Sequence, residues 1–215
     1  MQSQDKINAF YNTHAESYAK RYLNELQYKH LDRIVLREFA TTNGVQGRAA
    51  DFGCGPGQTT RFLHDNGLKE IVGIDISHEM IATARALHPG INFVEASMLE
   101  LPFDDGYFSS AVAFYAIVNL DYDQVTKAFL EIHRVLKPRS EFLVCFHTGN
   151  EVIHLGEFEG NPADVDFYLF EPDRMIRLLH ETGFQVLSAY ERYAYPDEYP
   201  SKRAYLWMWK EAPAG

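Results

Sequence analysis

A glycine-rich turn directly after a short apolar strand is the feature that most constrains this fold. Ala49-Ala50-Asp51-Phe52 leads into Gly53-Cys54-Gly55-Pro56-Gly57, so glycines stand at alternate positions where a strand gives way to a helix. Glycine permits a tight turn and lets a ligand approach the backbone where a Cβ would collide. The following helix presents free N–H groups and a partial positive charge to that ligand. The turn predicts a ligand site, although a purely structural strand-to-helix turn has the same pattern.

Strands and helices alternate along most of the chain. Residues 3 to about 39 are expected to form two helices that carry aromatic side chains at helical spacing. From Arg48 onward, uninterrupted apolar strands alternate with helices, which is typical of a parallel sheet covered on both faces. Residues 150–168 are acidic, contain glycines and lack clear periodicity, which indicates an insertion or lid. The last two strands, 184–192 and 203–210, are joined by a short segment that favours antiparallel pairing.

An acidic residue ends the second core strand. Asp75 closes Ile71–Asp75 and lies 22 residues after Gly53 (75 − 53). A carboxylate there can accept hydrogen bonds from both hydroxyls of a ribose. The alternative is a cap for the next helix, a role for which Ser77 is better placed. A dinucleotide fingerprint would need its third glycine at position 58, which is Gln58, so the spacing favours a ligand without a pyrophosphate.

Charge and composition exclude several classes of partner. The net charge is −10, and no cluster of Lys or Arg reverses it locally, so no nucleic-acid partner is expected. No run approaches 18 apolar residues, which predicts no membrane span, and the N-terminus does not resemble a signal peptide. Cys54 and Cys145 lie in apolar runs without metal-ligand spacing. They predict a reduced, cytoplasmic compartment and no metal site. Nothing in the sequence indicates the oligomeric state.

Five segments between about Tyr11 and Leu143 stand out when they are taken together. They are Tyr11-Asn-Thr-His-Ala-Glu-Ser-Tyr18, Asp51-Phe-Gly-Cys-Gly-Pro-Gly57, Gly73-Ile-Asp-Ile-Ser77, Leu101-Pro-Phe103 and Glu131-Ile-His-Arg-Val-Leu-Lys-Pro138. In their order and spacing they resemble the class I methyltransferases that use S-adenosylmethionine (SAM), particularly the small bacterial type that acts on metabolites. The resemblance implies a Rossmann-like α/β fold: a seven-stranded, mostly parallel sheet with an antiparallel last strand and an N-terminal helical lid.

We therefore expect one domain over residues 1–215. Its parts are an N-terminal lid (1–43), a cofactor-binding core (44–147), an insertion (148–168) and a final helix and hairpin (169–215).

The resemblance also implies SAM as cofactor, S-adenosylhomocysteine (SAH) as product, and a set of contacts. The implied contacts are Asp51, Gly53 and Gly55 with the methionine part, Asp75 with the ribose, Ile76 and Met80 with the adenine faces, Ser97 and Met98 with the adenine edge, Phe114 with the sulfonium, and Tyr11 and Tyr18 as a lid. Core packing is the alternative for the aromatic helix. Arg21 is either a partner of the SAM carboxylate or a solvated surface residue.

Two segments depart from the family pattern. Ala96-Ser97-Met98 stands where the family usually has Gly-Asp-Ala, so a neutral hydroxyl replaces a carboxylate as acceptor, and its hydrogen bond is weaker. Arg139-Ser140 stands where two glycines usually follow Lys137-Pro138. The second departure concerns a turn away from the cofactor and therefore its geometry more than activity.

Methyl transfer is a one-step displacement, so alignment is the main task of the protein. A base is needed only where the acceptor must lose a proton. Asn119, His147 and His154 are candidate bases, each with an ordinary loop role as the alternative. The small-molecule acceptor is expected to lie among the N-terminal helix, residues 150–168 and the Tyr-rich 190–205 segment, where the candidate lining residues are Tyr193, Tyr195, Tyr199 and Arg203.

Two other functions share parts of this pattern. One is a SAM-binding regulator without catalytic activity, which the Ala96-Ser97 departure and the lack of a clear base would allow. The other is a nicotinamide-dependent oxidoreductase, against which Gln58 and Leu101-Pro-Phe103 both count.

Overall fold

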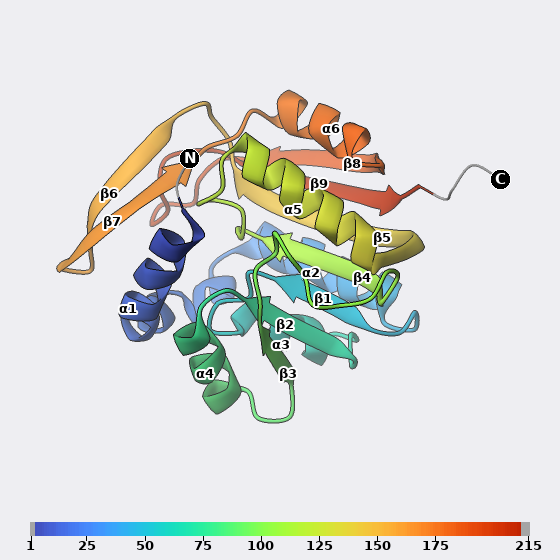
Figure 1. The fold of residues 1–215 in the computed structure, drawn as a ribbon, viewed down its shortest axis with the longest axis horizontal. Helices are drawn as coiled ribbons and strands as arrows, with labels where there is room; N and C mark the ends of the chain where they lie inside the picture. Colours follow the sequence, from blue (N-terminus) through green and yellow to red (C-terminus); the bar gives the residue numbers. More distant parts are fainter. Residues whose placement is uncertain (1–2, 212–215) are drawn as a thin grey trace.

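The main sheet has seven strands in the structure, a computed structural model that describes residues 3–211 (Figure 1). They are β1 (Ala49–Phe52), β2 (Ile71–Asp75), β3 (Asn92–Glu95), β4 (Phe108–Phe114), β5 (Leu136–His147), β8 (Phe184–Arg192) and β9 (Arg203–Lys210). Their order is β3-β2-β1-β4-β5-β9-β8. β9 pairs antiparallel with both β5 and β8, and the other neighbouring strands of the main sheet pair parallel. The predicted mostly parallel sheet with an antiparallel last strand is confirmed.

Helices cover both faces of this sheet. They are α1 (Gln4–Tyr22), the 3-10 helix η1 (Glu25–Gln27), α2 (His30–Asn43), α3 (Gln58–Asp65), α4 (His78–Leu87), α5 (Tyr122–Val135) and α6 (Pro172–Glu181). Apolar side chains of α5 and α6 form one core with the sheet, and those of α2 and α3 form another on the opposite face (Figure 1). A sheet buried on both faces explains why all seven residues of β4 are buried.

Local sequence signals fix where the helices begin. The Asp121 side chain accepts from the Gln124 backbone, and the Gln124 side chain accepts from the Asp121 backbone, which is a capping box for α5. Ser77 caps α4, because its Oγ accepts from the Met80 N–H at 3.1 Å. The expectation that Ser77 rather than Asp75 caps this helix is confirmed.

The segment 150–168 is a β-hairpin rather than an aperiodic insertion. β6 (Val152–Phe158) pairs antiparallel with β7 (Asn161–Tyr168), separate from the main sheet. Both turn residues have positive φ, 49° at Glu159 and 78° at Gly160. This geometry suits a two-residue hairpin turn, in which Asn-Gly or Asp-Gly is the usual signal. The Glu-Gly pair gives a weaker signal, so the sequence pattern did not predict the hairpin.

The turn after Lys137-Pro138 lies within β5, which begins directly after α5. Arg139 has a φ of 63°, the left-handed region in which glycine is favoured. The backbone therefore keeps the conformation that the two family glycines would suit, although the residues here are Arg139 and Ser140.

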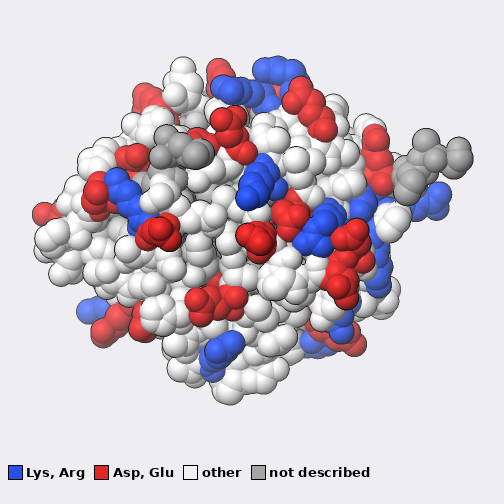
Figure 2. Space-filling view, viewed as in Figure 1, with Lys and Arg blue, Asp and Glu red and all other residues white. Residues whose placement is uncertain are grey.

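Acidic and basic side chains are interspersed on the face drawn in Figure 2, where no continuous basic area is visible. None of the helices between residues 3 and 211 is long and apolar enough to cross a membrane.

Candidate functional site

The candidate site lies at the carboxyl ends of the parallel strands. The strand order reverses between β1 and β4, and ligands of open α/β sheets bind at such a switch point. α1 and the β6–β7 hairpin both lie at this end of the sheet, on the left of Figure 1. Eight of the eleven residues implied to contact SAM are half-buried here: Tyr11, Tyr18, Gly53, Gly55, Asp75, Ile76, Ser97 and Met98. The sheet thus brings most of the predicted set to one edge.

The glycine turn has backbone angles that side chains rarely adopt. Gly53, Gly55 and Gly57 have φ values of 68°, 53° and 87°. A Cβ on Gly53 would lie 2.4 Å from Ala116 Cβ, so packing alone requires that glycine. A Cβ on Gly55 would meet nothing closer than Tyr18, at 3.8 Å. Gly53 therefore fixes the turn against the loop after β4, whereas Gly55 lies under the Tyr18 ring of α1, at a distance where a Cβ would make an ordinary van der Waals contact.

Asp75 braces the same turn. Its Oδ2 accepts from the Gly55 N–H and its Oδ1 from the Ser77 N–H, both at 2.9 Å. Burial raises the pKa of this carboxyl above its ordinary value, and the backbone donors oppose that shift. A carboxylate has about four acceptor positions, so capacity remains for a ribose hydroxyl.

Three of the implied contacts are buried beneath this edge. Met80 is fully buried in α4, and Phe114 packs against the Tyr205 ring with centroids 6.1 Å apart. Asp51 is 1% exposed, and Thr60 Oγ1 donates to its Oδ2 at 2.6 Å. Burial raises the pKa of Asp51 to about 7, and the charge of Asp75 adds to that shift. In this structure, these three side chains support the crevice from below.

Helix α1 covers the crevice through side-chain contacts. Tyr11 donates its hydroxyl proton to Asn119 Oδ1 at 2.6 Å. Asn12 Oδ1 accepts from Ser77 Oγ at 2.6 Å, and Ser97 donates to the side-chain oxygen of Gln4. Among residues 3–211, no backbone hydrogen bond joins α1 to the main sheet. Side chains alone therefore hold α1 in place, among them Ile7, which packs into the main core.

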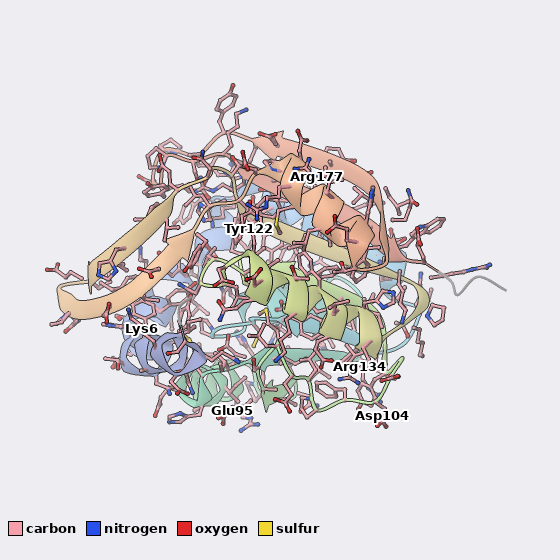
Figure 3. The ribbon with its side chains drawn as sticks, turned by 45° about the horizontal axis from the view of Figure 1, so that its top comes forward. Lys6, Glu95, Asp104, Tyr122, Arg134 and Arg177 are labelled. Carbon is pink, nitrogen blue, oxygen red and sulfur yellow. The ribbon has the colours of Figure 1, made fainter. Side chains whose placement is uncertain are left out.

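The hairpin packs against the other side of α1. Phe10 contacts the rings of Phe158 and Phe167, with centroids 5.6 and 6.3 Å apart. Lys6 pairs with Asp164 at 2.7 Å and lies where α1 faces the hairpin (Figure 3). Arg21, considered above as a partner of the SAM carboxylate, forms an ion pair with Glu159 at the hairpin turn instead.

None of the three candidate bases has the surroundings of a strong base. His147 is the last residue of β5, with Nδ1 2.9 Å from Ser201 Oγ, and burial together with the nearby Arg203 and Lys29 lowers its pKa to about 3. An imidazole with so low a pKa accepts protons weakly. His154 is exposed on the hairpin and pairs with Asp166 at 2.9 Å. Asn119 is buried and hydrogen-bonded to Tyr11.

A buried ionic cluster that the sequence analysis did not predict lies beside the site. Asp32 is fully buried, and its carboxylate accepts from Tyr205 at 2.6 Å, Tyr115 at 2.8 Å and Arg192 Nε at 3.1 Å. Arg192 also binds both oxygens of Glu198, at 2.6 and 2.9 Å. Burial alone would raise the pKa of Glu198, but this pairing outweighs it and lowers the pKa to about 2. The partners of Asp32 are far away in sequence, so no local pattern could reveal the cluster.

The predicted acceptor-lining residues do not converge. Tyr193 is 78% exposed, whereas Arg203 is 2% exposed. Tyr195 uses its hydroxyl to accept from the Leu31 N–H at 3.0 Å. Arg203 donates to the Tyr199 carbonyl at 2.8 Å. In this structure, Tyr195 and Arg203 hold the segment between β8 and β9 in place.

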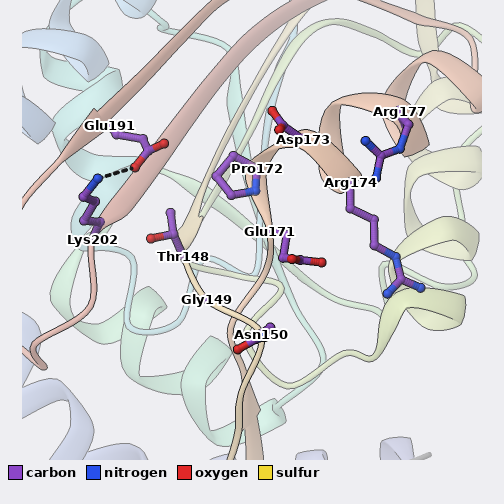
Figure 4. Close-up of a pocket in the computed structure, with 10 residues that line it drawn as sticks. All are labelled: Thr148, Gly149, Asn150, Glu171, Pro172, Asp173, Arg174, Arg177, Glu191 and Lys202. Atoms are coloured by element: carbon purple, nitrogen blue, oxygen red, sulfur yellow. Dashed lines mark ion pairs between the residues drawn. The ribbon is translucent and has the colours of Figure 1, made fainter.

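A cavity of about 520 Å³ lies apart from this crevice, where β5 meets α6 (Figure 4). Its lining carries cations and carboxylates in equal number, and Lys202 pairs with Glu191 at 3.3 Å. Tyr122 and Arg177 lie on α5 and α6 near it (Figure 3). The Arg174 guanidinium is 3.5 Å from the centre of the Tyr122 ring. Because both signs of charge line it equally, the cavity does not indicate a ligand of one charge.

The residues at the crevice fit an adenosyl amino acid. Asp75 has spare acceptor capacity for a ribose, and the turn at Gly55 is faced by the Tyr18 ring. Gln58 Oε1, at the start of α3, is buried and accepts no hydrogen bond from residues 3–211. A donor from water or from a ligand N–H would satisfy this buried acceptor.

Comparison with known families and proteins agrees with this geometry. Residues 49–139 match the family described as a methyltransferase domain. An uncharacterized methyltransferase of Synechocystis sp. is 30% identical, covering 65% of this chain and 68% of that protein. The malonyl-[acyl-carrier protein] O-methyltransferase of Enterobacter lignolyticus is 32% identical, covering 54% of this chain and 43% of that protein. The 2-phytyl-1,4-naphtoquinone methyltransferase of Nostoc sp. is 33% identical, covering 38% of each protein.

The chain thus spans about two fifths of the length of the last two relatives. Among solved structures, the glycopeptide N-methyltransferase MtfA complexed with SAM has a TM-score of 0.66 and 19% identity, covering 82% of this chain and 92% of that chain. At this identity, the likeness shows a shared fold.

Proposed function

Because this chain belongs to the class I SAM-dependent methyltransferases, we propose that it transfers the methyl group of SAM to a small-molecule acceptor. The observation that carries the proposal is Asp75, a half-buried carboxylate that is tied to the glycine turn at the switch point of the sheet. Bound SAM would supply an electrophilic methyl group on a sulfonium.

The residues of the chain would act by binding and orientation. Asp75 would hold the ribose hydroxyls, and Gly53 and Gly55 would let the amino-acid part lie against the turn. Tyr11 and Tyr18 on α1 would cover the ligand and exclude water. Orientation of reacting groups contributes up to about 7–11 kcal/mol. The weak basicity of His147 favours an in-line transfer that depends on alignment more than on a strong protein base.

A small molecule is favoured as acceptor by the relatives and by charge. The relatives with assigned substrates include a malonyl-[acyl-carrier protein] O-methyltransferase and a quinone methyltransferase. The net charge of −10 is unfavourable for a phosphate backbone.

The test is incubation of the protein with methyl-labelled SAM and a fractionated cell extract. We expect label in a low-molecular-weight product and accumulation of SAH. Label confined to RNA or protein would contradict the small-molecule assignment. SAM binding without label in any fraction would support the alternative of a non-catalytic regulator. Binding of NAD in place of SAM, in a thermal-shift comparison, would support an oxidoreductase.

A further inference from the structure

Gln58 carries an acceptor that the fold leaves unused. It opens α3 directly after the glycine turn, with Gly57 as the N-cap. Its Nε2 donates to Glu25 Oε1 at 3.1 Å. Its Oε1 is buried and has no hydrogen-bond partner within residues 3–211. Leaving a buried carbonyl oxygen unpaired costs stability, so a donor supplied by a ligand would recover that cost.

Two opposite charges lie next to this amide. Lys29 Nζ lies 2.5 Å from Glu25 Oε2 and 3.4 Å from Glu198 Oε1. The side chains of Glu25 and Lys29 are only 17% and 14% exposed. The Lys29 ammonium also lies 4.5 Å from the centre of the Tyr115 ring. A carboxylate, an ammonium and an unpaired carbonyl oxygen form a group that complements a zwitterion.

The group of Gln58, Glu25 and Lys29 lies near Asp75, and Tyr18 links the two. Gly55 donates to Asp75, and the Tyr18 ring lies over Gly55. Burial raises the pKa of Tyr18 well above its usual value, and the charges of Glu25 and Asp75 both add to the shift. Tyr18 is therefore close to both carboxylates. Asp75 contacts the glycine turn through Gly55, and Glu25 contacts the residue that follows the turn, Gln58.

The backbone conformation of Tyr115, which lies beside Lys29, is a further feature typical of ligand sites. It follows β4 with a φ of 58°, a left-handed conformation that is unfavourable for an aromatic residue. Its hydroxyl donates to the buried Asp32, and its ring lies beside Lys29. Such strain persists only where surrounding contacts hold it, and it is concentrated at ligand sites.

We propose that Gln58, Glu25 and Lys29 bind the zwitterionic amino-acid end of the cofactor. Gln58 Oε1 and the Glu25 carboxylate accept hydrogen bonds from its α-ammonium, and Lys29 pairs with its α-carboxylate. This inference rests on the proposed function and assigns one part of that site. Arg21, which the resemblance made a candidate for the carboxylate, is occupied by Glu159.

The test compares two ligands that differ only in this end. SAH carries the amino acid, whereas 5′-methylthioadenosine ends at the thioether methyl. Calorimetry on the wild-type chain should show SAH binding at least about tenfold more tightly. Gln58→Leu and Lys29→Met should each weaken SAH binding about tenfold or more, since each removes a hydrogen bond to a charged group, and should leave 5′-methylthioadenosine within twofold.

Gln185→Leu on β8, an exposed glutamine, is the matched control and should change neither affinity. Equal losses for the two ligands in Gln58→Leu would show a structural brace and overturn the inference, as would an unchanged SAH affinity. The wild-type comparison needs no variant to fold, and equal wild-type affinities would also overturn it. If the wild-type chain bound neither ligand, the proposed function itself would fail.

Discussion

Two carboxyl groups at neighbouring strands differ in how the fold uses them. Asp75 stands at the end of β2 and is half-buried, with backbone donors on both oxygens. Asp51 lies within β1 and is almost fully buried, with Thr60 as its partner. The sequence predicted Asp75 correctly as a strand-end acid because a carboxylate after an apolar strand has few structural uses. It could not show that Asp51, two residues before Gly53, is buried below the turn.

Asp51 makes stability depend on pH. Burial raises its folded-state pKa from 3.8 to about 7, so the folded chain keeps a proton that the unfolded chain loses. The protonated Asp51 therefore contributes to the free energy of unfolding. This contribution is fully present below pH 3.8 and is lost as the pH rises toward about 7. Asp51→Asn should remove this pH dependence, in which the free energy of unfolding falls by at most about 1.4 kcal/mol per pH unit. Urea unfolding at several pH values measures it, and identical slopes for both proteins would contradict the assignment.

At the scale of elements, α1 and the hairpin form one aromatic unit over the strand ends. Phe10, Phe158 and Val165 are its buried centre. The helix was predictable because its aromatics recur at helical spacing. The hairpin was not, because it buries few residues, pairs outside the main sheet and turns through Glu159-Gly160. The core strands were predictable because burial on both faces of the sheet leaves continuous apolar runs in the sequence.

Phe158→Ala should loosen α1 and leave the main sheet intact. The substitution removes ring contacts to Phe10, His14 and Tyr18. Without them, amide exchange in residues 4–22 should become faster, while exchange in β4 stays slow. Hydrogen exchange followed by mass spectrometry gives both readouts. Leu187→Ala, which truncates an exposed side chain on β8, serves as the control. Unchanged protection of α1 would show that other contacts hold the helix.

At the scale of the whole molecule, the strand order brings most of the proposed contacts to one edge. β1 and β4 are adjacent, with β2 and β3 on one side and β5, β9 and β8 on the other. The family resemblance predicted the mostly parallel sheet with its antiparallel last strand, whereas the strand order itself was not predicted. The cluster of Asp32, Arg192 and Glu198 was not, because it joins α2 to the chain after β8 through tertiary contacts alone.

The central claim is that an adenosyl ligand binds this edge with its ribose on Asp75. The most direct measurement is calorimetric titration of SAH into the wild-type chain and into Asp75→Ala. Asp75→Asn, which keeps an acceptor oxygen for the Gly55 N–H, separates bracing of the turn from ligand binding. We expect one site per chain and a loss of about 10- to 150-fold in Asp75→Ala, since a hydrogen bond to a charged group contributes about 1.5–3 kcal/mol. Unchanged affinity in a folded Asp75→Ala variant would contradict the claim.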